Sequence, residues 1–470
     1  MVFQSWNFIL FLFIVFIMNA MTKPQWRWLV LLAASYFFYG LTGWLPLILL
    51  IFSTLLTYQM GIQLGRMKDQ KQRYPLLVVS VLCQVVLLGI FKYLGFFESV
   101  YQCVVGKNVS WPQLILPLGI SFYTFQSMGY VFDVYYKIRK PEVHWGRYAL
   151  FVSFFPQIQS GPIGRSKKML PQLESIATVN FERFRFYSLL FSWGLMKKFV
   201  IADRLGNYVD PLYNAPVGQG AWVWSWTLAL YTLQLYTDFS AYSDMARAIA
   251  GVLGIEIPEN FLYPYKANNI TDFWRRWHLS LSGWLRDYIY TPVLFGFKKY
   301  KEGAIVLAIV ITFVICGIWH GAKITFVVFG IVQAALLLFE YATKSWREKW
   351  QTLLPSSFYQ GLSVCLTFVV VSFCFILFRA DDMTTVQQIV MEFLDWDWTP
   401  FKVYLGEKNA SRILGLVVML VLFIVFEERI ERKLNEVTSG KWQGLMLALL
   451  LSLIGIAGVL GKDEFIYFQF

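Results

Sequence analysis

Three histidines occur in the chain, and histidine is the side chain best suited to acid–base chemistry near neutral pH: His144, His278 and His320. His144 follows a basic loop and needs no special explanation. His320 ends the apolar run GAIVLAIVITFVICGIWH (303–320). An ionisable side chain in such surroundings usually faces a protein interior or a water-filled cavity. Desolvation would keep its imidazole neutral, which suits a general base, although a purely structural histidine bonded to a neighbouring helix is the alternative.

His278 lies in the segment TDFWRRWHLSLSGWLRDYIY (271–290). Tryptophans and leucines recur there at helical spacing, and charged residues occupy the other faces, so the pattern predicts one amphipathic helix. We expect Thr271 or Asp272 to cap its start, and the helix to lie in the membrane interface or dip into the protein. On the polar flank of such a helix, His278 is either an ordinary interfacial residue or a second catalytic group.

Acyl transfer to a hydroxyl suits these residues, because the hydroxyl must lose a proton as it attacks a thioester carbonyl. This chemistry needs no metal and no bound cofactor; the acyl thioester donor is a substrate. The sequence has no HExxH, GxSxG or phosphate-binding glycine motif. Cys316, four residues before His320, permits a Cys–His pair but is more often plain packing. Asp238, flanked by Tyr236 and Ser240, is the better candidate for a buried polar network that could orient a histidine.

The composition indicates that the surroundings of this fold are lipid. Hydrophobic residues make up 57% of the chain and charged residues only 15%, with a mean hydropathy of +0.53. About 11–12 apolar runs approach the ~20 residues that a helix needs to cross a bilayer. They fall at 6–21, 28–42, 44–62, 75–97, 114–135, 184–203, 221–250, 303–319, 322–341, 357–378, 412–427 and 442–460. The fold class is therefore all-α, a polytopic membrane protein.

The net charge of +12 is spread over short clusters between these runs, which is typical of the positive-inside rule and of contact with anionic lipids, not of nucleic-acid binding. If the loop at 66–73 is cytoplasmic, the clusters at 137–140 and 298–301 also fall inside. Residues 147–164 are apolar but broken by Pro156 and Pro162, so we expect a re-entrant segment that is buried in protein. No internal repeat is evident, and residues 1–470 are expected to form a single domain.

Several stretches, in order and at this spacing, resemble the membrane-bound O-acyltransferase superfamily, and within it the bacterial alginate O-acetylation branch. The most specific are YTDFSAYSD (236–244), DFWRRWHLSLSGWLRDYIY (272–290) and GIWHGA (317–322). The likeness also covers MVFQSWNFILFLFIVF, ASYFFYG, FKYLGFF, LPLGISFYTFQSMGYVFDVY, FVSFFPQIQSGPIGR, GLMKKFVIADRL and the terminal FIYFQF.

This resemblance implies a disc of helices around a central tunnel, in which a cytoplasmic acyl donor meets an acceptor from the other side. His320 would be the catalytic histidine, and His278 the second histidine of the polysaccharide-acetylating branch. Supporting or tunnel-lining roles would fall to Asp238, Trp319, Arg275, Arg276 and Ser282. The resemblance further implies a multi-pass protein of the cell (plasma or inner) membrane. Its acceptor would be a polysaccharide, reached directly or through a partner acetyltransferase of the SGNH-hydrolase type.

Three alternatives remain at this point. Related branches transfer D-alanyl groups or act on peptidoglycan, and they share the same core motif. A transporter of lipid-linked sugars is a second possibility, against which stands the lack of a repeat with paired broken helices. The third is a scaffold without catalytic activity, in which both histidines are structural.

Overall fold

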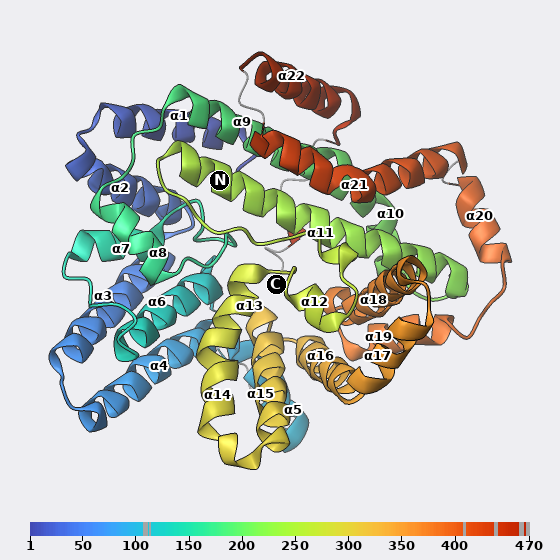
Figure 1. Ribbon diagram of the computed structural model, residues 1–470, viewed down its shortest axis with the longest axis horizontal. Coiled ribbons are helices and arrows are strands. Elements are labelled where there is room, and N and C mark those ends of the chain that lie inside the picture. Colours follow the sequence, from blue (N-terminus) through green and yellow to red (C-terminus); the bar gives the residue numbers. More distant parts are fainter. Residues whose placement is uncertain (107–110, 112–113, 408–409, 437–439, 460–464, 467–470) are drawn as a thin grey trace. The chain divides into compact units, whose positions relative to one another are not determined.

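The computed structural model describes the whole chain except residues 107–110, 112–113, 408–409, 437–439, 460–464 and 467–470 (Figure 1). Within this described part every regular element is a helix, which confirms the all-α prediction. The helices follow the apolar runs closely. The runs expected at 44–62, 303–319 and 322–341, for example, are α3 (Trp44–Arg66), α15 (Glu302–His320) and α16 (Ile324–Ala342).

The chain divides into two compact units. The first unit comprises Met1–Phe191, Tyr242–Glu259 and Asp463–Phe470, and the second comprises Ser192–Ala241 and Asn260–Lys462. Two helices, α9 (Phe181–Met196) and α11 (Gly220–Val252), contribute residues to both units. The single domain over 1–470 stays a prediction.

The first unit is a layer of packed helices, in which α6 contacts α3 and α4, and α7 contacts α2 and α3. Its elements are α1 (Trp6–Met21), α2 (Arg27–Gly40), α3, α4 (Gln70–Lys92), α5 (Leu94–Val105), α6 (Ile120–Tyr135), α7 (Trp145–Ser153) and α8 (Ser166–Glu174). All but one of the residues of α6 are buried, although the helix carries several hydroxyl and amide groups. This element therefore forms the interior of the first unit.

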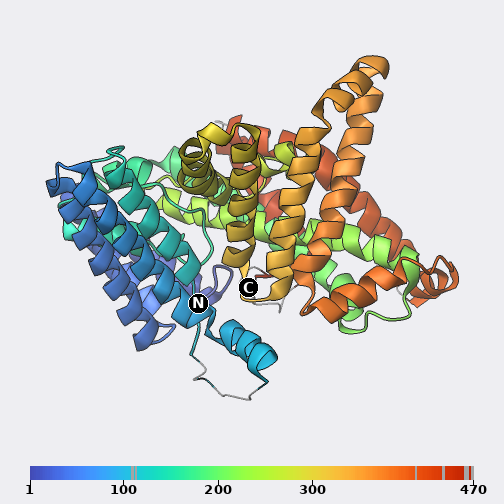
Figure 2. The same ribbon diagram turned by 90° about the horizontal axis from the view of Figure 1, so that it is seen from below.

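The second unit is built around the hairpin of α15 and α16, with α18 (Ser356–Arg379) packed beside α16 (Figures 1 and 2). Its other helices are α10 (Asp203–Asn214), α12 (Ile270–Trp274), α13 (Leu279–Leu285), α14 (Thr291–Gly296), α17 (Lys344–Leu353), α19 (Met383–Glu392), α20 (Thr399–Glu407), α21 (Ala410–Glu436) and α22 (Gly440–Ala457). The α15–α16 hairpin carries His320 at its turn, so this unit holds the predicted catalytic residue.

Six helices in the described part are long and apolar enough to cross a membrane: α3, α4, α15, α16, α18 and α22. A seventh is added if the bent pair Thr399–Gly406 and Ser411–Leu434 forms one span. The chain is therefore a multi-pass membrane protein. Helices such as α1, with 16 residues, are shorter than the ~20 residues that a full crossing needs, so a count of 11–12 crossings stays a prediction.

The segment expected to be re-entrant is broken and buried. Helix α7 ends at Ser153, and residues 154–164 continue without helix, all of them buried. Protein groups satisfy part of this irregular backbone: Phe155 N–H donates to Ser35 Oγ at 3.2 Å, and the side-chain amides of Gln126 and Gln157 donate to the carbonyl oxygen of Phe151. These partners come from the protein, which is what a non-helical backbone at membrane depth requires.

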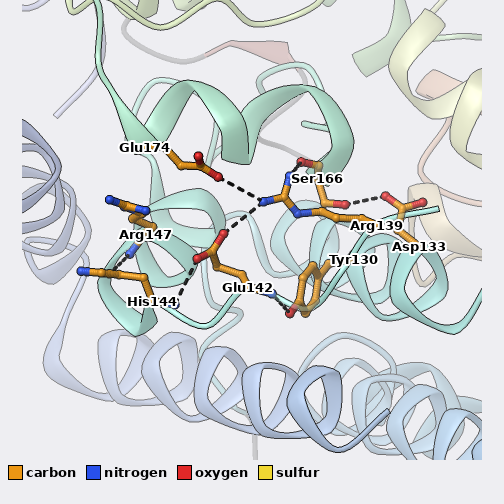
Figure 3. Close-up of polar contacts among 8 residues, drawn as sticks. All are labelled: Tyr130, Asp133, Arg139, Glu142, His144, Arg147, Ser166 and Glu174. Atoms are coloured by element: carbon orange, nitrogen blue, oxygen red, sulfur yellow. Dashed lines mark hydrogen bonds and ion pairs between the residues drawn. The ribbon is translucent and has the colours of Figure 1, made fainter. Parts of the chain in front are cut away.

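A polar network organises the connection between α6, α7 and α8 in the first unit (Figure 3). The guanidinium of Arg139 lies 3.0 Å from the Glu142 carboxylate and 3.9 Å from that of Glu174, and it donates to the carbonyl oxygen of Ser166 at 3.3 Å. Arg139 thus ties the start of α8 to the loop that precedes α7.

His144 is part of the same network and has a structural role. Its Nδ1 accepts a hydrogen bond from Arg147 N–H at 3.2 Å and so caps the start of α7, while its own N–H donates to Glu142 at 3.0 Å (Figure 3). Its ring also packs edge-on against Trp28. This agrees with the expectation that His144 needs no catalytic explanation.

Candidate active site

The segment around His278 is not one amphipathic helix, and that prediction is wrong. Helix α12 stops at Trp274, α13 begins at Leu279, and a π-helical turn follows at Arg286–Tyr290. The start is also different: Asn269 is the N-cap, and its side-chain oxygen accepts from Asp272 N–H at 2.7 Å. Apolar periodicity alone could not show the break, because the apolar residues at helical spacing are buried on both sides of it: Trp274, Leu281, Trp284 and Leu285.

The break is located at His278 itself. His278 has φ 45° and ψ 55°, the left-handed region that residues other than glycine adopt rarely. Such a conformation costs of order 1–3 kcal/mol and persists only where the surroundings enforce it, most often at functional sites. The chain turn at this residue directs the His278 side chain into the interior, where it is completely buried.

Asn260 fixes the orientation of the His278 ring. The side-chain oxygen of Asn260 lies 3.0 Å from His278 Nδ1, and it also accepts from the N–H and the hydroxyl of Ser280 at 3.2 and 2.8 Å. Because that oxygen is an acceptor, Nδ1 carries the proton and the imidazole lone pair is on Nε2. Burial lowers the pKa of His278 to about 3, so the ring is neutral at physiological pH.

His320 is the last residue of α15, because Gly321 leaves the helix in an extended conformation. Its ring is 5% exposed and is surrounded by aromatic rings of α16 and α18, with Phe378 closest at 5.0 Å between centroids. The other ring neighbours are Phe326, Phe329 and Trp319. His320 therefore lies inside the second unit and not against lipid, as expected.

Trp319 connects the two histidines. Its ring centroid lies 5.9 Å from that of His278 and 5.1 Å from that of His320, and its side chain is 3% exposed. Two histidines 42 positions apart in the sequence are therefore neighbours of one buried indole. Such a dry, aromatic environment strengthens any electrostatic interaction with a reacting group.

A close approach of two helices positions His320. A β-carbon at Gly317 would lie 2.2 Å from the carbonyl oxygen of Phe326 and 3.2 Å from the α-carbon of Gly330. Only glycine at both positions allows α15 and α16 to pack this tightly, as small residues commonly do between membrane helices. This contact lies one helical turn before the histidine.

Asp238 belongs to a buried polar network, as predicted, and its partner is a lysine that sequence reasoning missed. Lys198 Nζ lies 2.8 Å from the Asp238 carboxylate and 2.9 Å from that of Asp203, and all three side chains are buried. A role of Asp238 in orienting a histidine stays a prediction. The pair of lysines at 197–198, inside an apolar run, was the signal that could have pointed to this network.

The second unit also contains a cavity of about 1400 Å³, lined by the 268–290 segment and by parts of α15, α16, α17 and α18. Arg275, Arg276 and Ser282, three of the predicted tunnel-lining residues, line it. Further cationic side chains come from Arg286, Lys344 and Arg347. Three acids, Asp272, Glu340 and Glu348, also line the cavity, so the five cations leave its lining with a net positive charge. Its lining on α15 runs from Ile305 to Phe313, and His320 lies seven residues further along that helix, about 10 Å away along its axis.

Comparison with known proteins agrees with these features. Residues 143–378, which include both buried histidines, match the membrane-bound O-acyltransferase family. The chain is 30% identical to the peptidoglycan O-acetyltransferase of Helicobacter pylori over 97% of its length and 94% of that protein. It is 32% identical to a probable alginate O-acetylase of Pseudomonas putida over the full length of both chains. The teichoic acid D-alanyltransferase of Bacillus subtilis is 29% identical, over 56% of this chain and 69% of that protein.

The region that matches the family contains the two histidines around Trp319, the non-helical segment 154–164 and the cationic cavity. The similarity to O-acetyltransferases extends over nearly the whole chain. The chain therefore belongs to the membrane-bound O-acyltransferase family and is an O-acyltransferase.

Proposed function

We propose that this protein transfers an acetyl group from a thioester donor on the cytoplasmic side of the cell membrane towards a hydroxyl of an extracytoplasmic polysaccharide. The observation that carries the proposal is the pair of buried histidines around Trp319, in the same unit as a cationic cavity. The names of the full-length relatives, a peptidoglycan O-acetyltransferase and alginate O-acetylases, support acetyl as the group and a glycan as the acceptor.

In this reaction His320 acts as the general base. Its neutral imidazole takes the proton of the acceptor hydroxyl as the hydroxyl oxygen attacks the thioester carbonyl carbon. The tetrahedral intermediate collapses, the carbon–sulfur bond breaks, and the proton passes to the leaving thiolate. One positioned base contributes about 10²–10⁴ in rate, and the aromatic enclosure of His320 excludes the water that would hydrolyse the thioester.

His278 contributes as a second catalytic group. With Nδ1 bonded to Asn260, its lone pair on Nε2 can accept a hydrogen bond from the reacting groups, and its low pKa keeps the ring uncharged. The fixed ring orientation and the left-handed backbone make it a rigid group, which a catalytic contact requires.

The cavity is the proposed donor site. Acyl thioester donors carry phosphates, either as coenzyme A or on the arm of a carrier protein, and arginine binds phosphate oxygens in bidentate geometry. Arg275, Arg276, Arg286 and Arg347 line the cavity. By the positive-inside rule, the Lys298–Lys301 cluster supports a cytoplasmic position for the neighbouring start of α15, and such donors occur in the cytoplasm. Delivery to the polymer is direct or through an SGNH-type acetyltransferase partner.

Replacement of His320 tests this function. We expect His320→Ala to abolish O-acetylation of the envelope polysaccharide, measured as acetate released by mild alkali, while the protein remains in the membrane at its normal level. His144→Asn is the matched control, because asparagine preserves the helix cap and the residue lies in the first unit. His278→Asn should also lower acetylation.

The other outcomes identify the alternatives. If His320→Ala lowers polymer export instead of its acetylation, the protein is a transporter. If acetylation continues and partner binding persists, it is a scaffold. Supplying acetyl-CoA or a D-alanyl carrier thioester to purified protein distinguishes acetyl from D-alanyl transfer, the activity named for the shorter-matching relative.

A further inference from the structure

One face of α16 holds both ends of α12, the short helix that leads to His278. Gln333 and Glu340 are seven residues apart on α16 and therefore lie on the same side of that helix. The side-chain oxygen of Gln333 accepts from Trp274 Nε1 at 3.1 Å, and Glu340 Oε2 accepts from Thr271 N–H at 3.0 Å. Gln333 is 1% exposed, so the first contact is fully enclosed.

Glu340 also contacts the wall of the cavity. Its Oε1 lies 3.8 Å from Arg347 Nη2, and the same nitrogen donates to the Glu340 backbone oxygen at 2.7 Å. Arg347 is on α17, whose backbone is in turn joined to α18 by the hydroxyl of Tyr359, which donates to the Arg347 carbonyl oxygen at 3.4 Å. Glu340, Arg347 and Tyr359 all line the cavity.

The length of α12 makes these contacts important. The helix has five residues, too few to be stable by its own hydrogen bonds. The four residues that follow are not part of a helix, and the last of them is the left-handed His278. Helix α12 packs against α16 and α18 (Figure 1). The position of the His278 ring therefore depends on where α16 holds α12.

We propose that Glu340 is a positioning residue for the transfer reaction: it fixes α12, and through it His278, and it links that position to Arg347 at the donor cavity. The effect on the transfer reaction rests on the proposed function, but the role of Glu340 in fixing the position of α12 does not. A displacement of a catalytic group by about 1 Å can lower the rate roughly 100-fold, so a carboxylate outside the reacting groups can still determine kcat.

Two substitutions separate the two contacts of Glu340. Glu340→Gln keeps an oxygen for Thr271 N–H but removes the charge that faces Arg347. Glu340→Ala removes both. With purified protein, acetyl-CoA as donor, a hydroxyl-bearing polysaccharide as acceptor and thiol release as the readout, Glu340→Ala should lower kcat about 10- to 100-fold. Glu340→Gln should restore most of kcat, because its amide oxygen can still accept from Thr271 N–H, whereas Arg347→Ala should raise the KM for acetyl-CoA several-fold.

Hydrogen exchange provides a readout that does not depend on turnover. Amide exchange in peptides covering residues 270–280 should be faster in Glu340→Ala than in wild type and unchanged in Glu340→Gln. Glu182→Gln, an exposed acid-to-amide change in the first unit, is the control for both assays.

The outcomes distinguish this inference from the proposed function. If His320→Ala is inactive but Glu340→Ala has wild-type kcat and wild-type exchange, the inference is overturned while the function stands. Equal losses in Glu340→Ala and Glu340→Gln, in proportion to lost folded protein, would also overturn it by showing a merely structural role. If His320→Ala retains activity, the proposed function fails, and the exchange of residues 270–280 still decides whether Glu340 positions α12.

Discussion

At the scale of single residues, the site depends on buried polar groups whose partners are close in space and not always in sequence. His278 interacts with Asn260, 18 positions earlier, and Asn260 at the same time accepts both donors of Ser280. The sequence identified both histidines and the polar character of Asp238, but it did not identify Lys198, the buried partner of Asp238. It could not identify Asn260, since an asparagine in a loop has no distinctive pattern.

Removing the Asn260 side chain should therefore affect catalysis and stability together. Asn260→Ala leaves three buried donors without their acceptor, which costs about 1–3 kcal/mol for each group left unsatisfied. We expect at least a tenfold loss of transfer activity and a lower melting temperature in detergent. Asn260→Asp keeps the acceptor, and full activity in Asn260→Ala would contradict the role assigned to this residue.

The buried His278 ring also predicts a pH dependence of stability. Its pKa is about 3 in the folded protein and 6.5 when solvated, so between these values only the unfolded state binds the proton. Stability must therefore fall as the pH drops below 6.5, by up to about 1.4 kcal/mol per pH unit from this group. The melting temperature of wild type should drop more steeply between pH 6.5 and 4.5 than that of His278→Asn; parallel curves would refute the assignment.

At the scale of elements, the apolar runs predicted the helices well, since α3, α15 and α16 each match their run within a few residues. The failure at 271–290 has a physical cause. A left-handed residue interrupts the helix while the apolar residues on both sides of it stay buried, and hydrophobic periodicity reports only burial. The apolar runs at 303–319 and 322–341 predicted the helices α15 and α16, but not the glycine contact between them.

That contact gives a prediction about helix packing. Gly317→Ala places a methyl group 2.2 Å from the Phe326 carbonyl oxygen, so α15 and α16 must separate. Overpacking of this kind costs about 1–3 kcal/mol, and His320, one turn away, moves with α15. Thermal unfolding and transfer activity should both decrease. Gly361→Ala on α18 is the control, because nothing lies within 4 Å of its added carbon, and it should be neutral or slightly stabilising.

At the scale of the whole molecule, composition and charge clusters were sufficient to establish a helical, multi-pass membrane protein. They could not establish the number of crossings, since several apolar helices, such as the 14-residue α2, are shorter than a bilayer. The division into two units, with α9 and α11 shared between them, was also invisible, because contacts and not local patterns define it. The second unit contains the histidines, the cavity and Glu340.

The left-handed backbone of His278 has an evolutionary consequence. Two separate requirements act on this position. The transfer reaction requires an imidazole, while a positive φ favours glycine and asparagine. A lineage in which the enzyme loses its activity should drift there towards Asn or Gly, and not towards valine or isoleucine, whose branched side chains exclude this conformation. Such substitutions would show that the left-handed backbone is still required at this position after selection for the reaction has ended.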